Sequence, residues 1–181
     1  MKSNDTKVTA AAPSHNPQID HKNVDHKTAR FKLKVGPSPI HRWGVYACER
    51  IPKGSEIIEY TGEKIGRKQT KIRAEREFNY LFTLDSYWTI DGSVGGSGAE
   101  YINHCCEPNV EAEITDDWRI VYRALRDIHK GEEMTIDYRF GADVEKHPCA
   151  CGAPNCRGMI NLHKEKKAPR KKVAAGKKRS R

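Results

Sequence analysis

The sequence predicts a mainly β domain over about residues 30–141. Many short segments in this region alternate apolar and polar residues, as half-buried strands do, and glycine or proline separates them. Only one stretch is rich in helix formers and poor in breakers. The chain has 181 residues, of which 36% are hydrophobic, which suits one modest core. It has no run of about 18 apolar residues, so we expect no transmembrane helix.

The expected elements follow one another at short intervals. Strands are predicted at 31–35, 44–47, 56–60, 80–84, 87–90 and 134–138, with a hairpin at 110–124 that turns at Asp116 and Asp117. Residues 67–77 are predicted to form the single short helix, and the glycine-rich residues 92–98 a flexible connection. Many short strands with one helix are typical of a mainly β domain.

Polar segments flank this domain on both sides. Residues 1–29 show no periodicity and are expected to be a disordered N-terminal segment. Residues 162–181 are expected to be a basic disordered tail. Residues 161–181 hold ten Lys or Arg and one acidic residue, so they carry the whole net charge of +9. The rest of the chain has equal numbers of basic and acidic residues.

The segment 100–109 is dense in chemically active side chains. Four consecutive residues, from Asn103 to Cys106, place an amide, an imidazole and two thiols side by side, and Pro108 follows. Since Asn and Pro favour irregular backbone, we expect a loop between apolar strands. A loop so dense in chemical groups is interpreted as a functional site, and the alternative is a polar turn with buried cysteines.

A cysteine-rich appendix over residues 145–161 follows the domain. The N-terminus lacks the apolar stretch of a secretory signal, which indicates an intracellular, reducing compartment where cysteines bind metals or stay free. Cys149, Cys151 and Cys156 offer three thiolates within eight residues, whereas a structural zinc takes four ligands. The candidates for the fourth are, in order, Cys106, Cys105 and Cys48. Reduced free thiols are the alternative to a zinc site.

Taken in order, these motifs resemble the SET-domain protein-lysine methyltransferases that carry a post-SET zinc segment. The similar motifs lie at 38–47, 53–54, 59–63, 80–82, 103–109, 131–138 and 149–158. The resemblance implies a SET fold of small curved β-sheets with a C-terminal pseudoknot. It places the SET domain at 30–141 and the post-SET segment at 145–161. It also implies S-adenosyl-L-methionine as the methyl donor and a structural Zn²⁺.

The resemblance further implies roles for single residues. The matching cofactor-binding positions are His41, Trp43, Tyr80, Asn103 and His104, and the matching zinc ligands are Cys106, Cys149, Cys151 and Cys156. Tyr138 matches the catalytic tyrosine. Tyr80 matches a tyrosine near both the cofactor and the target amine, so it is a second catalytic candidate.

Methyl transfer from a sulfonium to a lysine is an in-line displacement that needs a neutral amine. The pKa of lysine is about 10.4 in water, so a narrow apolar channel has to favour the neutral form. By similarity, the hydroxyl of Tyr138 orients the amine and stabilises the sulfonium electrostatically. No carboxylate is an evident general base.

Four positions depart from the family pattern. Arg42 stands where many members have glycine, Glu100 where many have arginine, and Cys105 where serine is common. Ile136 replaces the phenylalanine or tyrosine that governs the number of methyl groups added. Since isoleucine has no hydroxyl to hold a water or restrict the amine, our hypothesis is that di- or trimethylation is possible.

The leading interpretation is a protein-lysine N-methyltransferase that acts on an exposed lysine of a basic, histone-like tail. The alternatives are a non-histone substrate (nucleoid, ribosomal or the chain itself) and a catalytically silent chromatin- or DNA-binding module. The basic residues 164–181 could contact nucleic acid, direct the protein to a nucleus or be methylated. The expected location is the nucleus or chromosome in a eukaryote. For a bacterial protein it is the cytoplasm, the nucleoid or a host nucleus.

Overall fold

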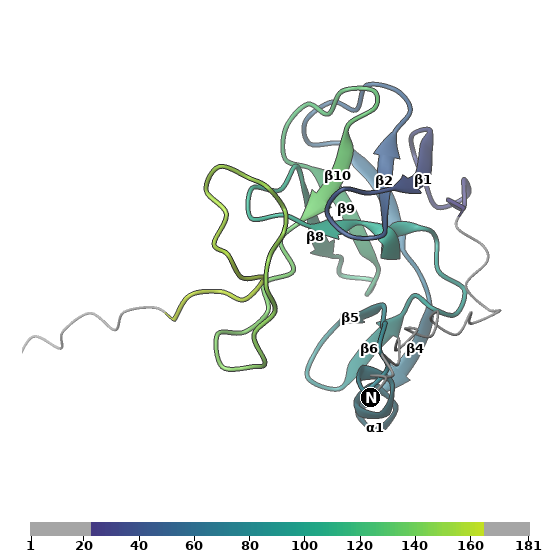
Figure 1. Cartoon of the computed structure of the whole chain (residues 1–181). Coiled ribbons are helices and arrows are strands. Elements are labelled where there is room, and N and C mark those ends of the chain that lie inside the picture. Colours follow the sequence, from purple (N-terminus) through teal and green to yellow (C-terminus); the bar gives the residue numbers. More distant parts are fainter. Residues whose placement is uncertain (1–22, 165–181) are drawn as a thin grey trace, which may run out of the picture.

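The computed structural model describes residues 23–164, which form ten short strands, one α-helix and one 3-10 helix (Figure 1). The strands are β1 (Leu33–Pro37), β2 (Trp43–Ala47), β3 (Glu56–Tyr60), β4 (Glu63–Gly66), β5 (Leu81–Thr83), β6 (Trp88–Asp91), β7 (Asn103–His104), β8 (Val110–Ile114), β9 (Ile120–Ala124) and β10 (Glu133–Ile136); the helices are α1 (Arg67–Ala74) and η2 (Ala99–Tyr101). The architecture is mainly β, with three small sheets, as predicted.

The first sheet has the strand order β1-β2-β10-β7. β2 pairs antiparallel with β1 on one side and with β10 on the other. β10 also pairs in parallel with β7, where Thr135 lies opposite Asn103 and Ile136 opposite His104. The last strand therefore lies between two earlier segments, which agrees with the predicted C-terminal pseudoknot. It brings Tyr138, two residues beyond its end, to the Asn103 segment.

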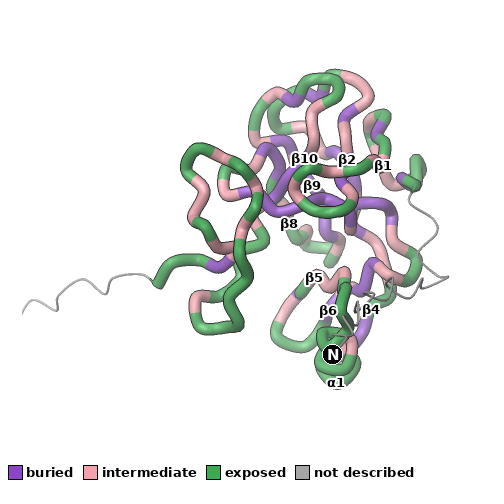
Figure 2. The backbone as a smooth tube through the Cα atoms, viewed as in Figure 1, coloured by how far each residue is buried: buried purple, intermediate pink, exposed green. Residues whose placement is uncertain are grey.

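The second sheet, β3-β9-β8, lies at the centre of the core. β8 and β9 form the predicted hairpin. β9 is mostly buried along its length (Figure 2), and its residues Ile120, Val121 and Tyr122 are almost completely inaccessible to solvent. Burying one large apolar side chain contributes about 1.5–3 kcal/mol, so this strand is a main source of the domain's stability.

The third sheet, β4-β6-β5, carries the helix α1 on its outer side (Figure 1). α1 buries none of its residues. Arg73 connects it to the sheet through ion pairs with Asp91 at 2.6 Å and Glu63 at 2.7 Å. Because Asp91 is fully buried, loss of Arg73 would remove its shorter ion pair and leave, among the described residues, only the 3.5 Å contact with Arg76 to compensate its charge.

The structure differs from the sequence-based expectation in four places. β4, β7 and η2 were not predicted, because each is too short to show a period. The helix ends at Ala74 instead of residue 77, and the last strand ends before Tyr138. Residues 92–98 are packed at both ends and exposed in the middle: Gly92, Ser97 and Gly98 are buried, whereas Val94 and Gly95 are exposed.

Residues 23–29 pack onto the domain, whereas the sequence analysis placed them in the disordered segment 1–29. Val24 is buried in the core, and the amide of Asp25 donates to the carbonyl of Ser97 at 2.8 Å. One apolar side chain in a polar stretch produces no periodicity, so the sequence did not show this contact. Residues 1–22, and residues 165–181 of the predicted basic tail, lie outside the described part of the chain.

Within residues 23–164, none of the helices has the length and apolar character needed to span a lipid bilayer.

Candidate active site and metal centre

Asn103 holds the loop at 38–43 in place. Its side chain is buried, and its amide nitrogen lies 2.8 Å from the carbonyl oxygen of Trp43 and 3.3 Å from that of His41. The same nitrogen lies 3.0 Å from the Ser38 hydroxyl and 2.9 Å from the Glu133 carboxylate. Three predicted cofactor-binding positions, His41, Trp43 and Asn103, are thereby brought together.

Glu133 is a residue of this network that the sequence analysis missed. Its carboxylate accepts a hydrogen bond of 2.8 Å from the Ser38 hydroxyl and joins β10 to the loop at 38–43. A Cβ on Gly44 would lie only 2.2 Å from the Glu133 carboxylate, so a side chain at this position would displace the carboxylate from the network. A glutamate in a strand with acidic neighbours gives no sequence signal of such a role.

Arg42 places its side chain over the aromatic ring of Phe78. Its backbone is in the left-handed region, with φ of 43°, and its guanidinium lies 3.9 Å from the centroid of the Phe78 ring. The left-handed conformation explains why glycine is common at this position in similar proteins. In this chain, the arginine instead adds a cation–π contact.

His104 is a neutral, buried imidazole that connects two parts of the site. Its Nδ1 accepts a hydrogen bond of 3.1 Å from the backbone amide of Tyr138, so that nitrogen carries no proton. The Nε2–H then donates to the sulfur of Cys106, 3.5 Å away. Burial lowers the pKa of His104, against the opposing charge of Asp137, which favours the neutral form.

Tyr138 lies directly beside this histidine. Its hydroxyl donates to the carbonyl oxygen of Ile102 at 3.0 Å, and its ring centroid lies 5.4 Å from that of His104. Burial of the phenol raises the pKa of Tyr138, and Tyr80 raises it further, so the hydroxyl keeps its proton at neutral pH. The residue as a whole is 36% exposed, so part of it is accessible from outside the domain although the hydroxyl is buried.

A cluster of tyrosines surrounds this position. Tyr80 packs edge-on against Tyr101 with ring centroids 5.5 Å apart, and the Tyr60 hydroxyl donates to the carbonyl oxygen of Tyr80 at 2.6 Å. Burial raises the pKa of Tyr101 to about 12. Tyr60 and Tyr101 were not predicted as site residues, although Tyr60 is in a segment that resembles a family motif and Tyr101 lies two residues before another. Ile136, the predicted methylation-state position, is buried opposite His104.

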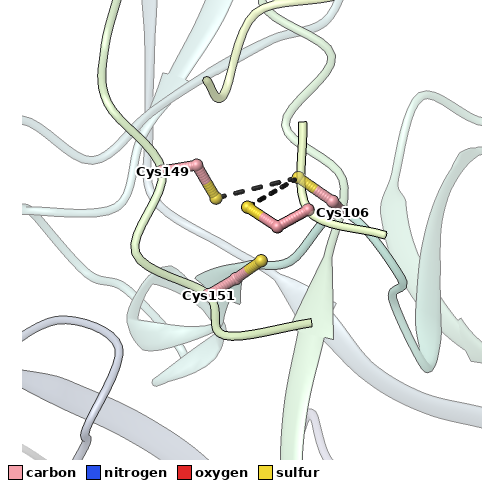
Figure 3. A group of neighbouring side chains, drawn as sticks. Cys106, Cys149 and Cys151 are labelled. Atoms are coloured by element: carbon pink, nitrogen blue, oxygen red, sulfur yellow. Dashed lines mark hydrogen bonds between the residues drawn. The ribbon is translucent and has the colours of Figure 1, made fainter. Parts of the chain in front are cut away.

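The structure brings the four predicted metal ligands together, and their sulfur atoms lie within 4.8 Å of one another (Figure 3). The sulfur of Cys106 lies 3.7 Å from that of Cys149 and 3.9 Å from that of Cys156. A tetrahedral zinc with Zn–S bonds of about 2.3 Å places its ligands about 3.8 Å apart, so the cluster could hold this ion. The other two candidates for the fourth ligand, Cys105 and Cys48, are outside the cluster.

The electrostatics of the cluster favour ionisation of one thiol. Burial raises the pKa of Cys149. Burial also acts on Cys151, but hydrogen bonds from backbone amides and neighbouring thiols outweigh it and lower the pKa of Cys151 to about 6. A thiolate is the form that binds a metal, so Cys151 is prepared for this role.

Residues 42–139 match the family described as "SET domain". The chain belongs to this family. The match contains Asn103, His104 and Tyr138 and ends before Cys149. The SET domain thus accounts for the fold and for the segment that holds these three residues, while the cysteine-rich appendix lies outside the match.

Several curated relatives are similar to this SET domain. A "Histone-lysine N-methyltransferase, H3 lysine-4 specific" of Saccharomyces cerevisiae is 44% identical over 136 residues, which are 68% of this chain and 13% of the relative. Proteins with the same description from Eremothecium gossypii and Schizosaccharomyces pombe are 44% and 41% identical over 152 and 144 residues, which are 77% and 75% of this chain. The chain spans 13–16% of the length of these relatives.

Proposed function

We propose that this chain is an S-adenosyl-L-methionine-dependent protein-lysine N-methyltransferase that acts on histone tails. The observation that carries this proposal is the meeting of the Asn103–His104 segment, the loop at 38–43 and Tyr138 in a SET domain. The relatives are described as specific for lysine 4 of histone H3, so histone H3 is the first substrate to test.

The residues present suit S-adenosyl-L-methionine. His41 is exposed and Trp43 half-buried on a loop that Asn103 fixes, so they offer flat surfaces to a heterocycle. We assign cofactor binding to this loop, to Asn103 and His104, and to Tyr80. When bound, the cofactor supplies an electrophilic methyl group on a sulfonium.

The tyrosines supply the remaining requirements of methyl transfer. The protonated hydroxyl of Tyr138 orients the lysine amine, and its oxygen dipole favours positive charge at the reacting atoms. Tyr80 narrows the approach of the amine. Aligning the reacting atoms at about 3–3.5 Å can supply much of the rate acceleration. Burial among aromatic rings disfavours the lysine ammonium and so favours the neutral amine.

We assign a structural zinc to Cys106, Cys149, Cys151 and Cys156. The separations between the four sulfur atoms suit this ion. With Cys106 as the fourth ligand, the ion would attach the appendix to the segment that carries His104. We place the SET domain at 30–141, with residues 23–29 packed against it, and the post-SET segment at 145–161.

Label transfer to three acceptors tests the function. The purified chain is incubated with methyl-labelled S-adenosyl-L-methionine and with core histones, with a histone-like nucleoid protein, or alone. We expect label on core histones. Label only on the nucleoid protein or on the chain itself would contradict the histone assignment and support the non-histone alternative. No label, together with no binding of the cofactor, would contradict the enzyme assignment and support a silent chromatin-binding module.

The buried Ile136 leads to a prediction about the product. We expect the chain to add two or three methyl groups, because isoleucine leaves room for a methylated amine to turn. The variant Ile136→Tyr should stop at one methyl group. Mass spectrometry of a histone H3 peptide after exhaustive turnover checks both. Only monomethyl product from the unaltered chain would contradict the assignment of this position.

The basic residues 164–181 support a nucleic-acid partner and a nuclear, chromosomal location. Their charge is typical of segments that bind nucleic acid electrostatically, and the relatives are described as histone-modifying. Deletion of 164–181 should abolish a salt-dependent gel shift with duplex DNA. An unchanged gel shift would show that another surface is responsible.

A further inference from the structure

Arg157 and Asp137 form an ion pair that joins the cysteine-rich appendix to the end of β10. Arg157 directly follows Cys156, and Asp137 directly precedes Tyr138. The two terminal nitrogens of the guanidinium bind the two carboxylate oxygens at 2.9 Å and 2.8 Å. Such a two-pronged pair fixes the orientation of both side chains and not only their separation.

Asp137, whose side chain is fixed by Arg157, also contacts residues next to Tyr138. Its Oδ1 accepts a hydrogen bond of 3.1 Å from the backbone amide of Arg139, which has a left-handed backbone with φ of 51°. The same oxygen lies 3.6 Å from Nδ1 of His104, and that nitrogen accepts from the amide of Tyr138. Asp137 therefore holds the backbone that follows Tyr138, and His104 holds the Tyr138 amide itself; the unprotonated Nδ1 of His104 forms no bond with the Asp137 carboxylate.

Arg157 is also fixed at its other end. Its backbone amide donates to the sulfur of Cys106 at 3.4 Å, and its side chain donates to the carbonyl oxygen of Ile160 at 3.1 Å. Cys106 in turn contacts Nε2 of His104. The contacts thus form a closed ring. It runs from Cys106 to Arg157, through the ion pair to Asp137 and the adjoining Tyr138, and back through His104 to Cys106.

The pair is poorly suited to a role in stability alone. Both side chains are mostly buried, with 17% of Arg157 and 18% of Asp137 exposed. The Nε of Arg157 is buried and has no hydrogen-bond partner among the described residues. Such an unpaired buried donor lowers the free energy of unfolding. Buried ion pairs are often no more stabilising than apolar residues of similar volume, and their best-supported role is to specify one arrangement.

We propose that Arg157 is a positioning residue for methyl transfer, which acts through Asp137 to hold the Tyr138 backbone where its hydroxyl meets the target amine. This rests on the proposed methyltransferase function. The cysteine cluster thereby serves catalysis from a distance: it fixes Arg157, and Arg157 fixes the turn that carries the tyrosine. Because small displacements of reacting groups are costly, loosening this turn slows the chemical step while leaving substrate binding largely intact.

A double variant with two uncharged substitutions distinguishes a role of the ion pair in positioning Tyr138 from a role in the stability of the fold. The double variant Asp137→Asn/Arg157→Met removes both charges, so neither is left buried alone, and it preserves side-chain volume. A matched control is Glu113→Gln/Arg123→Met, which removes a more exposed pair from the β8–β9 hairpin. If the double variant does not fold, Arg157→Lys keeps the charge but loses the two-pronged geometry.

Four quantities are measured: kcat and KM of methyl transfer to core histones, zinc content, and hydrogen exchange of the amides at 138 and 139. We expect kcat to fall between about tenfold and a hundredfold, with KM changed less than about twofold. Hydrogen exchange of the amides at 138 and 139 should be faster in the double variant, and its zinc content should be unchanged. The control variant should match the unaltered chain in all of these measurements.

Two results would overturn the proposal. One is an unchanged kcat with unchanged exchange at 138 and 139. The other is loss of zinc together with faster exchange throughout 145–161, which would make the pair a structural clip. If the unaltered chain transfers no methyl group at all, the proposed function fails, and the exchange measurement alone still decides whether Arg157 positions the Tyr138 backbone.

Discussion

Glu100 is a carboxylic acid placed among tyrosines, in a position where similar proteins often have arginine. One oxygen accepts a hydrogen bond of 2.8 Å from the amide of Gly98, and no ion pair to it is found within residues 23–164. Burial raises the pKa of Glu100 to about 7, against the opposing effect of backbone amides. Its negative charge in turn raises the pKa of Tyr101, after the larger effect of burial.

The raised pKa of Glu100 predicts how stability depends on pH. The folded state binds the proton more tightly than the unfolded state, whose pKa is near 4.5. The free energy of unfolding contributed by this group is therefore fully present below about pH 4.5 and is lost as the pH rises through about 7. Relative to Glu100→Gln, the unaltered chain should lose on the order of 3 kcal/mol over this range.

Urea denaturation at several pH values checks this prediction for Glu100. The control is Glu111→Gln, which alters an exposed glutamate on β8. We expect the stability difference between the unaltered chain and Glu100→Gln to change with pH, and that for Glu111→Gln to stay nearly constant. Parallel pH profiles for the unaltered chain and Glu100→Gln would contradict the burial of a titrating carboxyl at this position.

At the scale of single elements, Asn109 connects the polar segment 100–109 to β10. Its side chain is buried, its amide nitrogen donates to the carbonyl oxygen of Glu133 at 2.8 Å, and its oxygen accepts from the amide of Thr135 at 2.8 Å. The Asn109 side chain thus forms, with the backbone of β10, the two hydrogen bonds that a neighbouring strand would otherwise form. The segment that looked like an irregular loop therefore fixes the last strand from two sides.

Replacing this asparagine should weaken the fold. Asn109→Ala leaves a buried amide and a buried carbonyl of β10 without partners, so we expect a loss of about 1–3 kcal/mol in the free energy of unfolding. Asn79→Ala is the control, because Asn79 is exposed and its contact with the Ala74 carbonyl is 3.5 Å long. Chemical denaturation measures both, and equal small losses would show that Asn109 is dispensable for β10.

The cysteine-rich appendix buries little apolar surface of its own. Few apolar side chains in residues 145–161 are buried, so the metal would supply most of its folding energy. We expect about one zinc ion per chain, loss of zinc in Cys156→Ser, and faster proteolysis of the appendix in that variant. Cys48→Ser, which alters a cysteine outside the cluster, should keep its zinc. Equal zinc content in both variants would contradict the ligand assignment.

At the scale of the whole molecule, the sequence predicted the parts of the fold that have a period or a motif. The alternating residues of β1, β8 and β9 predicted their strands, and the three cysteines of the appendix predicted a fourth partner from elsewhere. The structure places the sulfur of Cys106 beside those of the other three cysteines. Asn103, His104 and Tyr138 were identified by resemblance, and the structure brings them together.

Other features depend on contacts between distant parts of the chain and so left no local signal. β7 has two residues and exists only because β10 pairs with it. The roles of Glu133 and Arg157 depend on partners 30 and 20 positions away along the chain. Val24 is buried although its neighbours are polar, because residues 97–98 lie against it. Such features follow from tertiary packing, which overrides local propensity.

The central claim is that the site around Tyr138 performs methyl transfer. The most direct test is the single-turnover rate of methyl transfer to core histones, measured for Tyr138→Phe and for Tyr87→Phe, which removes the hydroxyl of an exposed tyrosine. Binding of S-adenosyl-L-methionine is measured in parallel. We predict that Tyr138→Phe binds the cofactor but transfers at least about a hundredfold more slowly, while Tyr87→Phe matches the unaltered chain. An undiminished rate in Tyr138→Phe would contradict the account.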